Sequence, residues 1–283
     1  MATAQQLLKR FNDMKTLPHV AIRLSKLISD EKSTMQEFEE VIRLDPTLVL
    51  RLLRVANSPY YGVKQKVDSI ARAVVFIGMK NLRNMVVTEA LKDIFKGGTQ
   101  EDIFSRNQLW LHCAATSICG KMISERIFGQ KGEDVFLCGI LHDVGMIVED
   151  QTAKDVFIQT CKAYEPNSKQ ITAYEREIIG TDHSEIGDIL AYDWKMSPEV
   201  QEGIKHHHRS LNEVSPSSIA GITQMAVYIV SQLNYAAMPG MKGILSPPLA
   251  THIRDNLKEY KALARDLPDE MSKARELYEV QGE

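Results

Sequence analysis

Residues 136–145 read FLCGILHDVG, an apolar stretch that carries the adjacent pair His142 and Asp143. Apolar residues recur at a spacing of three and four around this stretch, which predicts one buried helix over residues 133–149. A His-Asp pair in such surroundings costs on the order of several kcal/mol of desolvation unless the two side chains are paired or hold a ligand. The pair is therefore the most specific chemical feature of the sequence.

Six of the eight histidines fall between residues 112 and 208, on predicted helices or helix ends. They are His112, His142, His183, His206, His207 and His208. A divalent ion held by protein needs imidazole or carboxylate ligands from separate helices, because one helix presents only neighbouring turns. Two other interpretations stay open. A lone histidine on an apolar helix is usually a core residue with its hydrogen bonds satisfied. The triple His206-His207-His208 could also be a solvated run at the end of a helix.

The same helical spacing extends outward from this stretch in both directions and predicts an all-α protein with little or no β structure. Local signals also predict helix starts. Asp45 suits an N-cap, with Pro46 as the first residue of the helix. Asp182 and Glu185 suit a capping box that begins a helix at His183. The residues Lys96-Gly97-Gly98-Thr99-Gln100 form the best linker. We therefore predict a helical subdomain over 1–97, a second over 98–235 and a helical extension over 236–283.

Composition sets the broad class of the 283-residue chain, which has 34 Lys+Arg, 37 Asp+Glu and 44% hydrophobic residues. No apolar run is long enough for a membrane helix and no signal peptide is visible, which predicts a cytoplasmic protein without a membrane segment. The four cysteines form no CxxC and predict buried free thiols. Residues 1–100 hold 16 Lys+Arg and 10 Asp+Glu, but the acidic remainder argues against nucleic acid as a partner.

Several stretches together resemble the HDOD domain family, in order and over residues 12–210. In the N-terminal part they are Leu17-Pro18, Asp45-Pro46-Thr47-Leu48, residues 52–58 (LLRVANS), residues 69–74 (SIARAV) and Ile77-Gly78. In the later part they are residues 139–145 (GILHDVG), residues 182–187 (DHSEIG) and the segment from Trp194 to His208. The resemblance implies an N-terminal helical subdomain packed on a helical bundle like that of the HD superfamily.

HDOD domains resemble the HD metal-dependent phosphohydrolases and are regarded as their output or scaffolding form in bacterial signalling. Carried over by position, the resemblance implies metal ligation by His112, His142, Asp143, His183, His207 and His208, with Asp143 as the catalytic candidate if the protein is active. The ion would be iron, manganese, zinc or nickel, and in the enzymes a metal-bound hydroxide attacks phosphorus. His206 falls one place before the paired histidines.

Two positions depart from the enzymes of this superfamily. Val227 stands where the last ligand Asp is expected, and Met146 stands where cyclic di-GMP phosphodiesterases of the HD-GYP type have a lysine. After His208 the chain reads Arg209-Ser210-Leu211, without a Gly-Tyr-Pro segment. A metal ligand, a phosphate-neutralising cation and a substrate loop are thus missing, which argues against hydrolysis of cyclic di-GMP.

Three hypotheses follow from these features. The first is a non-catalytic signalling module that acts by contact with signalling proteins and keeps a degenerate metal site. The second is a metal-dependent phosphohydrolase or phosphodiesterase with an atypical His-rich site. The third, a DNA-binding regulator that uses residues 70–87, has the basic N-terminal half in its favour and the acidic remainder against it. The sequence leaves the oligomeric state and the binding of a small nucleotide open.

Overall fold

The computed structural model describes residues 2–11, 19–30, 32–58, 65–95, 98–166, 168–209 and 214–278. The chain divides into two compact units. The larger unit consists of Met1–Lys15 and Lys92–Ser272, and the smaller unit consists of Thr16–Leu91 and Lys273–Glu283.

The smaller unit is built from four short amphipathic helices and one longer helix. They are α2 (His19–Ser29), α3 (Met35–Arg43), α4 (Pro46–Ala56), α5 (Ile70–Ile77) and the greater part of α6 (Met79–Phe95). Local sequence fixes their starts: the Thr34 side chain accepts a hydrogen bond from the backbone of Glu37 in a capping box, and the Asp45 carboxylate caps α4 at Leu48 N. Helices α2 to α5 bury one apolar stripe each, with Leu24, Phe38 and Leu52 fully enclosed, whereas α6 is buried around its circumference over residues 82–88.

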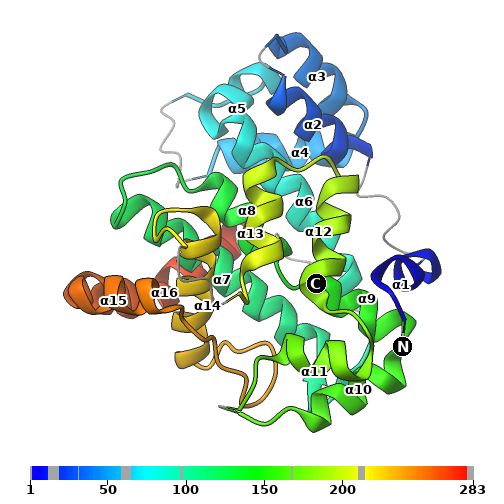
Figure 1. The fold of residues 1–283 in the computed structure, drawn as a ribbon. Coiled ribbons are helices and arrows are strands. Elements are labelled where there is room, and N and C mark those ends of the chain that lie inside the picture. Colours follow the sequence, from blue (N-terminus) through cyan, green and yellow to red (C-terminus); the bar gives the residue numbers. More distant parts are fainter. Residues whose placement is uncertain are drawn as a thin grey trace. The chain divides into compact units, whose positions relative to one another are not determined.

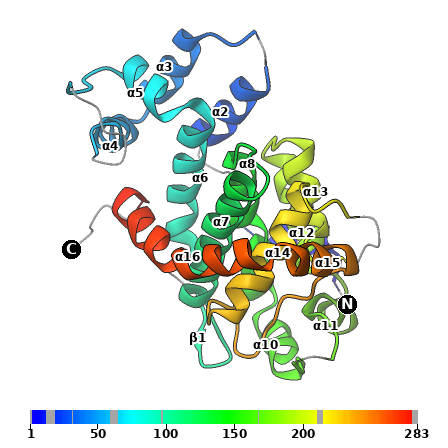
Figure 2. The ribbon, with the colours of Figure 1, turned by 90° about the vertical axis from the view of Figure 1, so that its left-hand side faces the viewer.

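The larger unit contains the remaining helices. They are α1 (Ala4–Arg10), α7 (Arg106–Arg126), α8 (Glu133–Leu141), α9 (Val144–Thr152), α10 (Lys154–Ala163), α11 (Ile171–Ile178), α12 (His183–Asp193), α13 (Pro198–His206), α14 (Ile219–Gln232), α15 (Pro247–Asp255) and the greater part of α16 (Leu257–Tyr278). Figures 1 and 2 both show α7, α8, α13 and α14 side by side, and α12 packs against α9 and α13. This bundle presents its inner faces to one another, which brings residues distant in sequence together.

The all-α prediction is confirmed in the described residues. The β structure consists of a hairpin in which β1 (Gln100–Glu101) pairs antiparallel with β2 (Phe104–Ser105). The helix α1 packs on α9 and α12 of the larger unit, and Ala2 N donates to the carbonyl of Ile179. The predicted divisions after residues 97 and 235 stay predictions.

The single helix predicted over residues 133–149 is wrong. The structure has two helices there, α8 and α9, separated by His142 and Asp143. The apolar spacing continues across this break, so periodicity does not detect it. The break turns the Asp143 side chain out of a regular helical register, which is what lets it face residues from several other helices.

Two glycines permit close approach of backbones next to this break. A Cβ at Gly139 would lie 2.5 Å from the Cα of Ser117 on α7, and a Cβ at Gly145 would overlap the backbone of His183 at the start of α12. Any other residue would force these helices apart. The glycines of the stretch FLCGILHDVG thus set the separations on which the histidine cluster depends.

Some sequence predictions fall partly or wholly outside the described residues. They concern Leu17-Pro18, the linker residues Lys96 and Gly97, and Ser210-Leu211. The four cysteines are buried and unpaired, as predicted. Among the described residues, no helix is both long and apolar enough to span a bilayer.

Candidate metal centre

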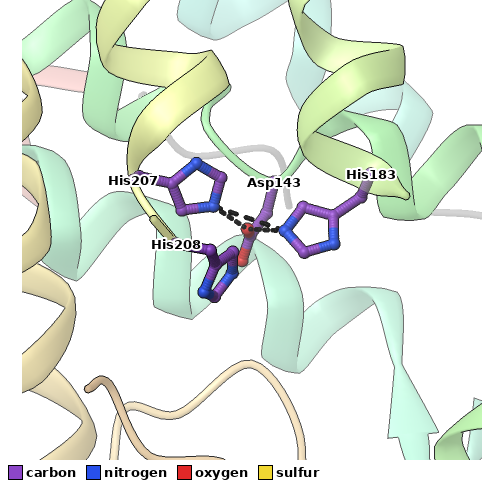
Figure 3. A group of neighbouring side chains, drawn as sticks. All are labelled: Asp143, His183, His207 and His208. Carbon is purple, nitrogen blue, oxygen red and sulfur yellow. Dashed lines mark hydrogen bonds and ion pairs between the residues drawn. The ribbon is translucent and has the colours of Figure 1, made fainter. Parts of the chain in front are cut away.

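The carboxylate of Asp143 lies at the centre of a histidine cluster. Its Oδ2 is 3.4 Å from Nε2 of His112 and 3.2 Å from Nε2 of His142. Its Oδ1 is 3.3 Å from Nε2 of His183 and 3.3 Å from Nε2 of His207. Figure 3 shows the His183 and His207 rings pointing at this carboxylate from two sides. All five side chains are buried, so residues from four separate places in the sequence meet at one enclosed point.

Backbone carbonyls fix the orientation of three of these imidazoles. Nδ1 of His112 lies 2.6 Å from the carbonyl oxygen of Tyr235, Nδ1 of His142 lies 2.7 Å from that of Gly139, and Nδ1 of His207 lies 2.6 Å from that of Ile204. Because a carbonyl can only accept, each Nδ1 carries the proton and donates it. The neutral ring then has its lone pair on Nε2, directed at Asp143.

His183 is held differently, by a carboxylate. Its Nδ1–H donates to Glu175 at 2.7 Å, and its backbone N–H donates to the same carboxylate at 3.1 Å. Sequence analysis missed Glu175, which lies on α11 and is fully buried. The signal available in the sequence was a carboxylate on an amphipathic helix before a cap residue, which is too common a pattern to single out one residue.

The start of α12 places His183 at its first helical position. The Asp182 carboxylate accepts from the backbone N–H groups of Ser184 and Glu185, each at 3.0 Å, which confirms the predicted N-cap. The Glu185 side chain accepts from the Thr181 hydroxyl at 2.8 Å, so the reciprocal half of the predicted capping box is replaced by a different contact. The cap fixes where the His183 ring leaves the helix.

His207 and His208 follow the last turn of α13. Gln224 on α14 holds this turn, because its side-chain amide donates to the carbonyl of His206 at 3.0 Å and to that of Arg209 at 2.9 Å. The ring of His208 packs with its centroid 4.2 Å from that of His207, and its Nε2 is buried without a hydrogen-bond partner among the described residues.

His206 lies apart from the cluster. Its Nε2 contacts Glu202 at 3.1 Å, one turn earlier on α13. The histidine triple is therefore divided: the His206 side chain, 15% exposed, pairs with Glu202 on the same helix, whereas His207 and His208 point toward Asp143.

Burial and charge act in opposite directions on the cluster. Burial lowers the pKa of His112 and of His207 to about 4, and it lowers the pKa of His208 as well. Burial also opposes a charge on His183, but the carboxylates of Glu175 and Asp143 outweigh it and raise its pKa well above the usual value. For Asp143, the surrounding histidines overcome the effect of burial and hold its pKa well below its ordinary range.

The donors fall into two groups that share Asp143 and could each hold a metal ion. We call Asp143 Oδ2, His112 and His142 the Oδ2 group, and Asp143 Oδ1, His183, His207 and His208 the Oδ1 group; the donor atoms within each lie within 4.8 Å of one another. Neither oxygen of Asp143 has a hydrogen-bond partner within the described residues. Buried acceptors and lone pairs facing one another in this way fit a cation between them.

The two departures noted in the sequence are both interior positions. Met146 on α9 is 0% exposed and Val227 on α14 is 4% exposed. Neither side chain can supply the cation or the carboxylate that the enzymes of the superfamily have at these places. The Oδ2 group thus keeps three of its expected donors and lacks the fourth.

Comparison with known proteins agrees with the fold and the sequence motifs. The model of the HDOD domain matches residues 14–210. A curated relative from Treponema pallidum, itself uncharacterised, is 24% identical over 208 residues, which are 72% of this chain and 39% of that protein. The chain therefore spans about two fifths of the length of this relative.

Solved structures share the fold over almost the whole chain. An HDOD domain protein of unknown function from Geobacter sulfurreducens has a TM-score of 0.72 at 24% identity, over 97% of this chain and 96% of that one. A protein from Marinobacter aquaeolei, provisionally named as a signal transduction protein, has a TM-score of 0.73 at 18% identity, over 99% of this chain and 62% of that one. A protein from Shewanella amazonensis, provisionally named as a phosphohydrolase, has a TM-score of 0.58 at 26% identity, over 92% of this chain and 97% of that one. Since the family model covers more than half of its length, this chain belongs to the HDOD domain family.

Proposed function

We propose that this protein is a metal-binding signalling module that acts by contact with other signalling proteins and does not turn over a substrate. The observation that carries the proposal is the convergence of five imidazoles on the wholly buried carboxylate of Asp143. Without a cation, such a cluster is energetically costly, because the carboxylate is buried away from water and the lone pairs of the imidazole nitrogens face its oxygens. A metal ion bound in each group would remove both costs.

The donor set suits particular ions. Imidazole nitrogen with one shared carboxylate is a set that zinc, iron, manganese and nickel accept, whereas calcium and magnesium prefer oxygen. In the Oδ2 group the ion would be held by His112, His142 and Asp143, and in the Oδ1 group by Asp143, His183, His207 and His208. Because the ligands come from α7, α12, the turn that follows α13 and the break between α8 and α9, these ions would tie the larger unit together.

The lack of catalysis is supported by the interior positions that differ from the enzymes. A phosphoester substrate brings negative charge that a cation must neutralise, and the side chain at the expected place is the apolar Met146. The missing carboxylate at Val227 leaves the Oδ2 group with fewer donors, which weakens the hold on its ion.

Protein contact is supported by apolar side chains on the smaller unit. Val75 on α5 is 72% exposed, and Phe76 and Met79 follow with 46% and 41%. Exposed apolar residues close together in sequence are typical of surfaces that bind another protein. Partners of the kind that the proposal names, signalling proteins, would bury these side chains.

A second candidate function is phosphoester hydrolysis, and one observation favours it. A cavity of about 670 Å³ is lined by Gln108 and Leu111, on the turn of α7 that precedes His112, and by Asn234 and Lys242 beyond α14. A bound ion would supply a water with a lowered pKa as nucleophile and would polarise a phosphoryl oxygen. The cavity offers room for a substrate within the larger unit.

The test is metal analysis of the tag-free protein, combined with hydrolysis assays. We expect near-integral iron, manganese, zinc or nickel that is lost in Asp143→Ala, and no hydrolysis of bis(p-nitrophenyl) phosphate with any of these ions. Asp188→Ala is a matched control, because Asp188 lies on α12 and pairs with Lys205 at the surface.

Two outcomes would decide against the proposal. Metal well below one ion per chain in the unmodified protein would remove its basis. Turnover that disappears in a folded Asp143→Ala protein, but persists in Asp188→Ala, would replace it with the phosphohydrolase.

A further inference from the structure

A second cavity of the larger unit, of about 760 Å³, lies between α1, the junction of α9 with α10, and the end of α11. We call it the α1–α10 cavity. Figure 1 shows α1 beside α9, the helix on which it packs. The cavity lies at the end of α9 that bears Thr152, whereas Asp143 precedes the other end, so roughly 13 Å of helix separates it from the metal centre. The proposed function does not use this cavity.

Three cationic side chains from two separate segments line the α1–α10 cavity. Lys9 and Arg10 belong to the last turn of α1, and Lys154 is the first residue of α10. All three are exposed, and none of them pairs with an acidic side chain in the part of the chain that the structure describes. The acidic residue among the described lining residues is Asp155, so three cations and one carboxylate leave the lining with a net positive charge.

This arrangement differs from a row of solvated lysines on one helix face. An exposed lysine on an open surface interacts weakly with anions, because water and salt screen its charge. In a concave site the protein walls have a low dielectric constant and concentrate the field of charges of one sign, which raises the local concentration of anions. Cations that reach one hollow from two segments, without acidic partners, therefore point to an anionic ligand.

Part of the wall of the α1–α10 cavity is apolar. The buried side chains of Leu7 and Ile179 line it, and so does Val156 on α10, which is 37% exposed. A small hydrated ion gains nothing from such a wall, whereas a ligand with a planar or apolar part would cover it and release water. The volume also falls within the range of roughly 300–1,000 Å³ that is typical of small-molecule sites.

We propose that the α1–α10 cavity binds a nucleotide, with its phosphates against Lys9, Arg10 and Lys154 and its base against the apolar wall at Val156. A nucleotide joins several negative charges to a planar ring, which matches both parts of the lining. The guanidinium of Arg10 can hold a phosphate through two parallel N–H donors, and the two lysines act as point charges. The site uses none of the metal ligands, so the proposal does not depend on the proposed function.

Isothermal titration calorimetry of the tag-free, metal-free protein tests the proposal with ADP, GDP and inorganic pyrophosphate as probes. We expect saturable binding of ADP or GDP at about one site per chain, because the base and the phosphates are both recognised. Pyrophosphate lacks the base and should bind about tenfold more weakly. Adenosine lacks the phosphates and should show no measurable binding. No binding of either ADP or GDP would overturn the proposal.

Charge variants locate the phosphates. Lys154→Gln should weaken nucleotide binding by about tenfold, since a charge-assisted contact with a phosphate is lost. Lys162→Gln is the matched control: it removes the same charge from an exposed position of the same helix, but outside the cavity lining. Asp155→Asn removes the opposing charge and should tighten binding by about threefold. Equal weakening in Lys154→Gln and Lys162→Gln would mean that only the overall charge matters, and would overturn the proposal.

Val156→Ser separates the base from the phosphates. Nucleotide binding should weaken by about threefold while pyrophosphate binding stays unchanged, because only the apolar contact is reduced. An unchanged nucleotide affinity would contradict the placement of the base.

Asp143→Ala separates this site from the metal centre, and nucleotide should bind this variant as it binds the unmodified protein. Binding that is lost in Asp143→Ala but kept in Lys154→Gln would place the nucleotide at the histidine cluster and overturn the proposal. Because the titrations use metal-free protein, a failure of the metal analysis would reject the proposed function and leave this test unaffected.

Discussion

The two halves of the histidine cluster share one carboxylate but differ in what surrounds it. The Oδ2 group has two imidazoles, and both are held by backbone carbonyls deep in the bundle. The Oδ1 group has three imidazoles, one of them held by the carboxylate of Glu175, and it includes His208, which is less fully buried than the rest.

This difference predicts an order of affinity. Three imidazoles and a carboxylate complete a four-coordinate site for zinc, whereas two imidazoles and a carboxylate leave a position to be filled by another donor. The negative charge of Glu175 also makes His183 a more basic ligand than a ring held by a carbonyl. We therefore expect the Oδ1 group to bind its ion more tightly than the Oδ2 group, although both use the same aspartate.

The largest expected effect comes from the residue that the two groups share. Asp143→Ala removes one donor from each group and the anion that offsets the charge of both ions, so metal content should fall close to zero. Elemental analysis after dialysis measures it, and circular dichroism checks that the helices remain. Retention of one full ion in a folded variant would show that one group holds its ion without Asp143, and would contradict the assignment of this carboxylate to both groups.

Removing one histidine from each group compares the groups directly. His183→Ala should weaken the tighter ion by more than about 100-fold, because a lost ligand costs more than a lost outer partner. His112→Ala should instead remove the weaker ion and leave the tighter one in place. Competition with a chromophoric chelator measures both affinities, and the opposite pattern would reverse the proposed order.

Proton release gives a third comparison. In metal-free protein the pKa of His183 is raised well above its ordinary value, so the ring is protonated at pH 7, whereas the pKa of His112 is lowered to about 4 and its ring is neutral. An ion that enters the Oδ1 group must displace the His183 proton, and its affinity should fall roughly tenfold for each unit of pH lowered below 7. The affinity of the Oδ2 group should stay flat until the pH approaches the pKa of His112.

Calorimetric titration in two buffers of different protonation enthalpy measures this release. About one proton per ion is expected for the Oδ1 group and none for the Oδ2 group. The release should disappear in His183→Ala, which serves as the control. Equal release from both groups would contradict the assignment of the proton to His183.

Local sequence signals predicted much of this molecule. The caps at Asp45 and Asp182 mark helix starts correctly, because capping depends on residues within one turn. The six proposed ligands could be named because they match the motifs of a family. The break at His142 and Asp143 was not predicted, since the apolar spacing runs through it without interruption.

The supporting contacts were beyond prediction for a physical reason. The carbonyl of Tyr235 that orients His112 lies 123 residues further along the chain. A carbonyl can also come from any residue type, so the identity of Tyr235 gives no signal. Glu149 and Glu175 approach His183 only through the packing of α9 and α11 on α12. Such contacts are set by tertiary structure, and the sequence carries no local pattern for them.

The smallest expected effect concerns the turn that carries His207 and His208. Gln224→Leu removes the two hydrogen bonds from the side-chain amide to the carbonyls of His206 and Arg209, and should lower the free energy of unfolding by about 1–3 kcal/mol. Because that turn supplies ligands to the Oδ1 group alone, its ion should weaken by about tenfold or less while the Oδ2 ion is unaffected. Gln232→Leu, at an exposed position on the same helix, is the control. Urea unfolding with and without Zn²⁺ measures both quantities, and equal weakening of the two ions would show that the groups are mechanically coupled through Asp143 and do not respond separately.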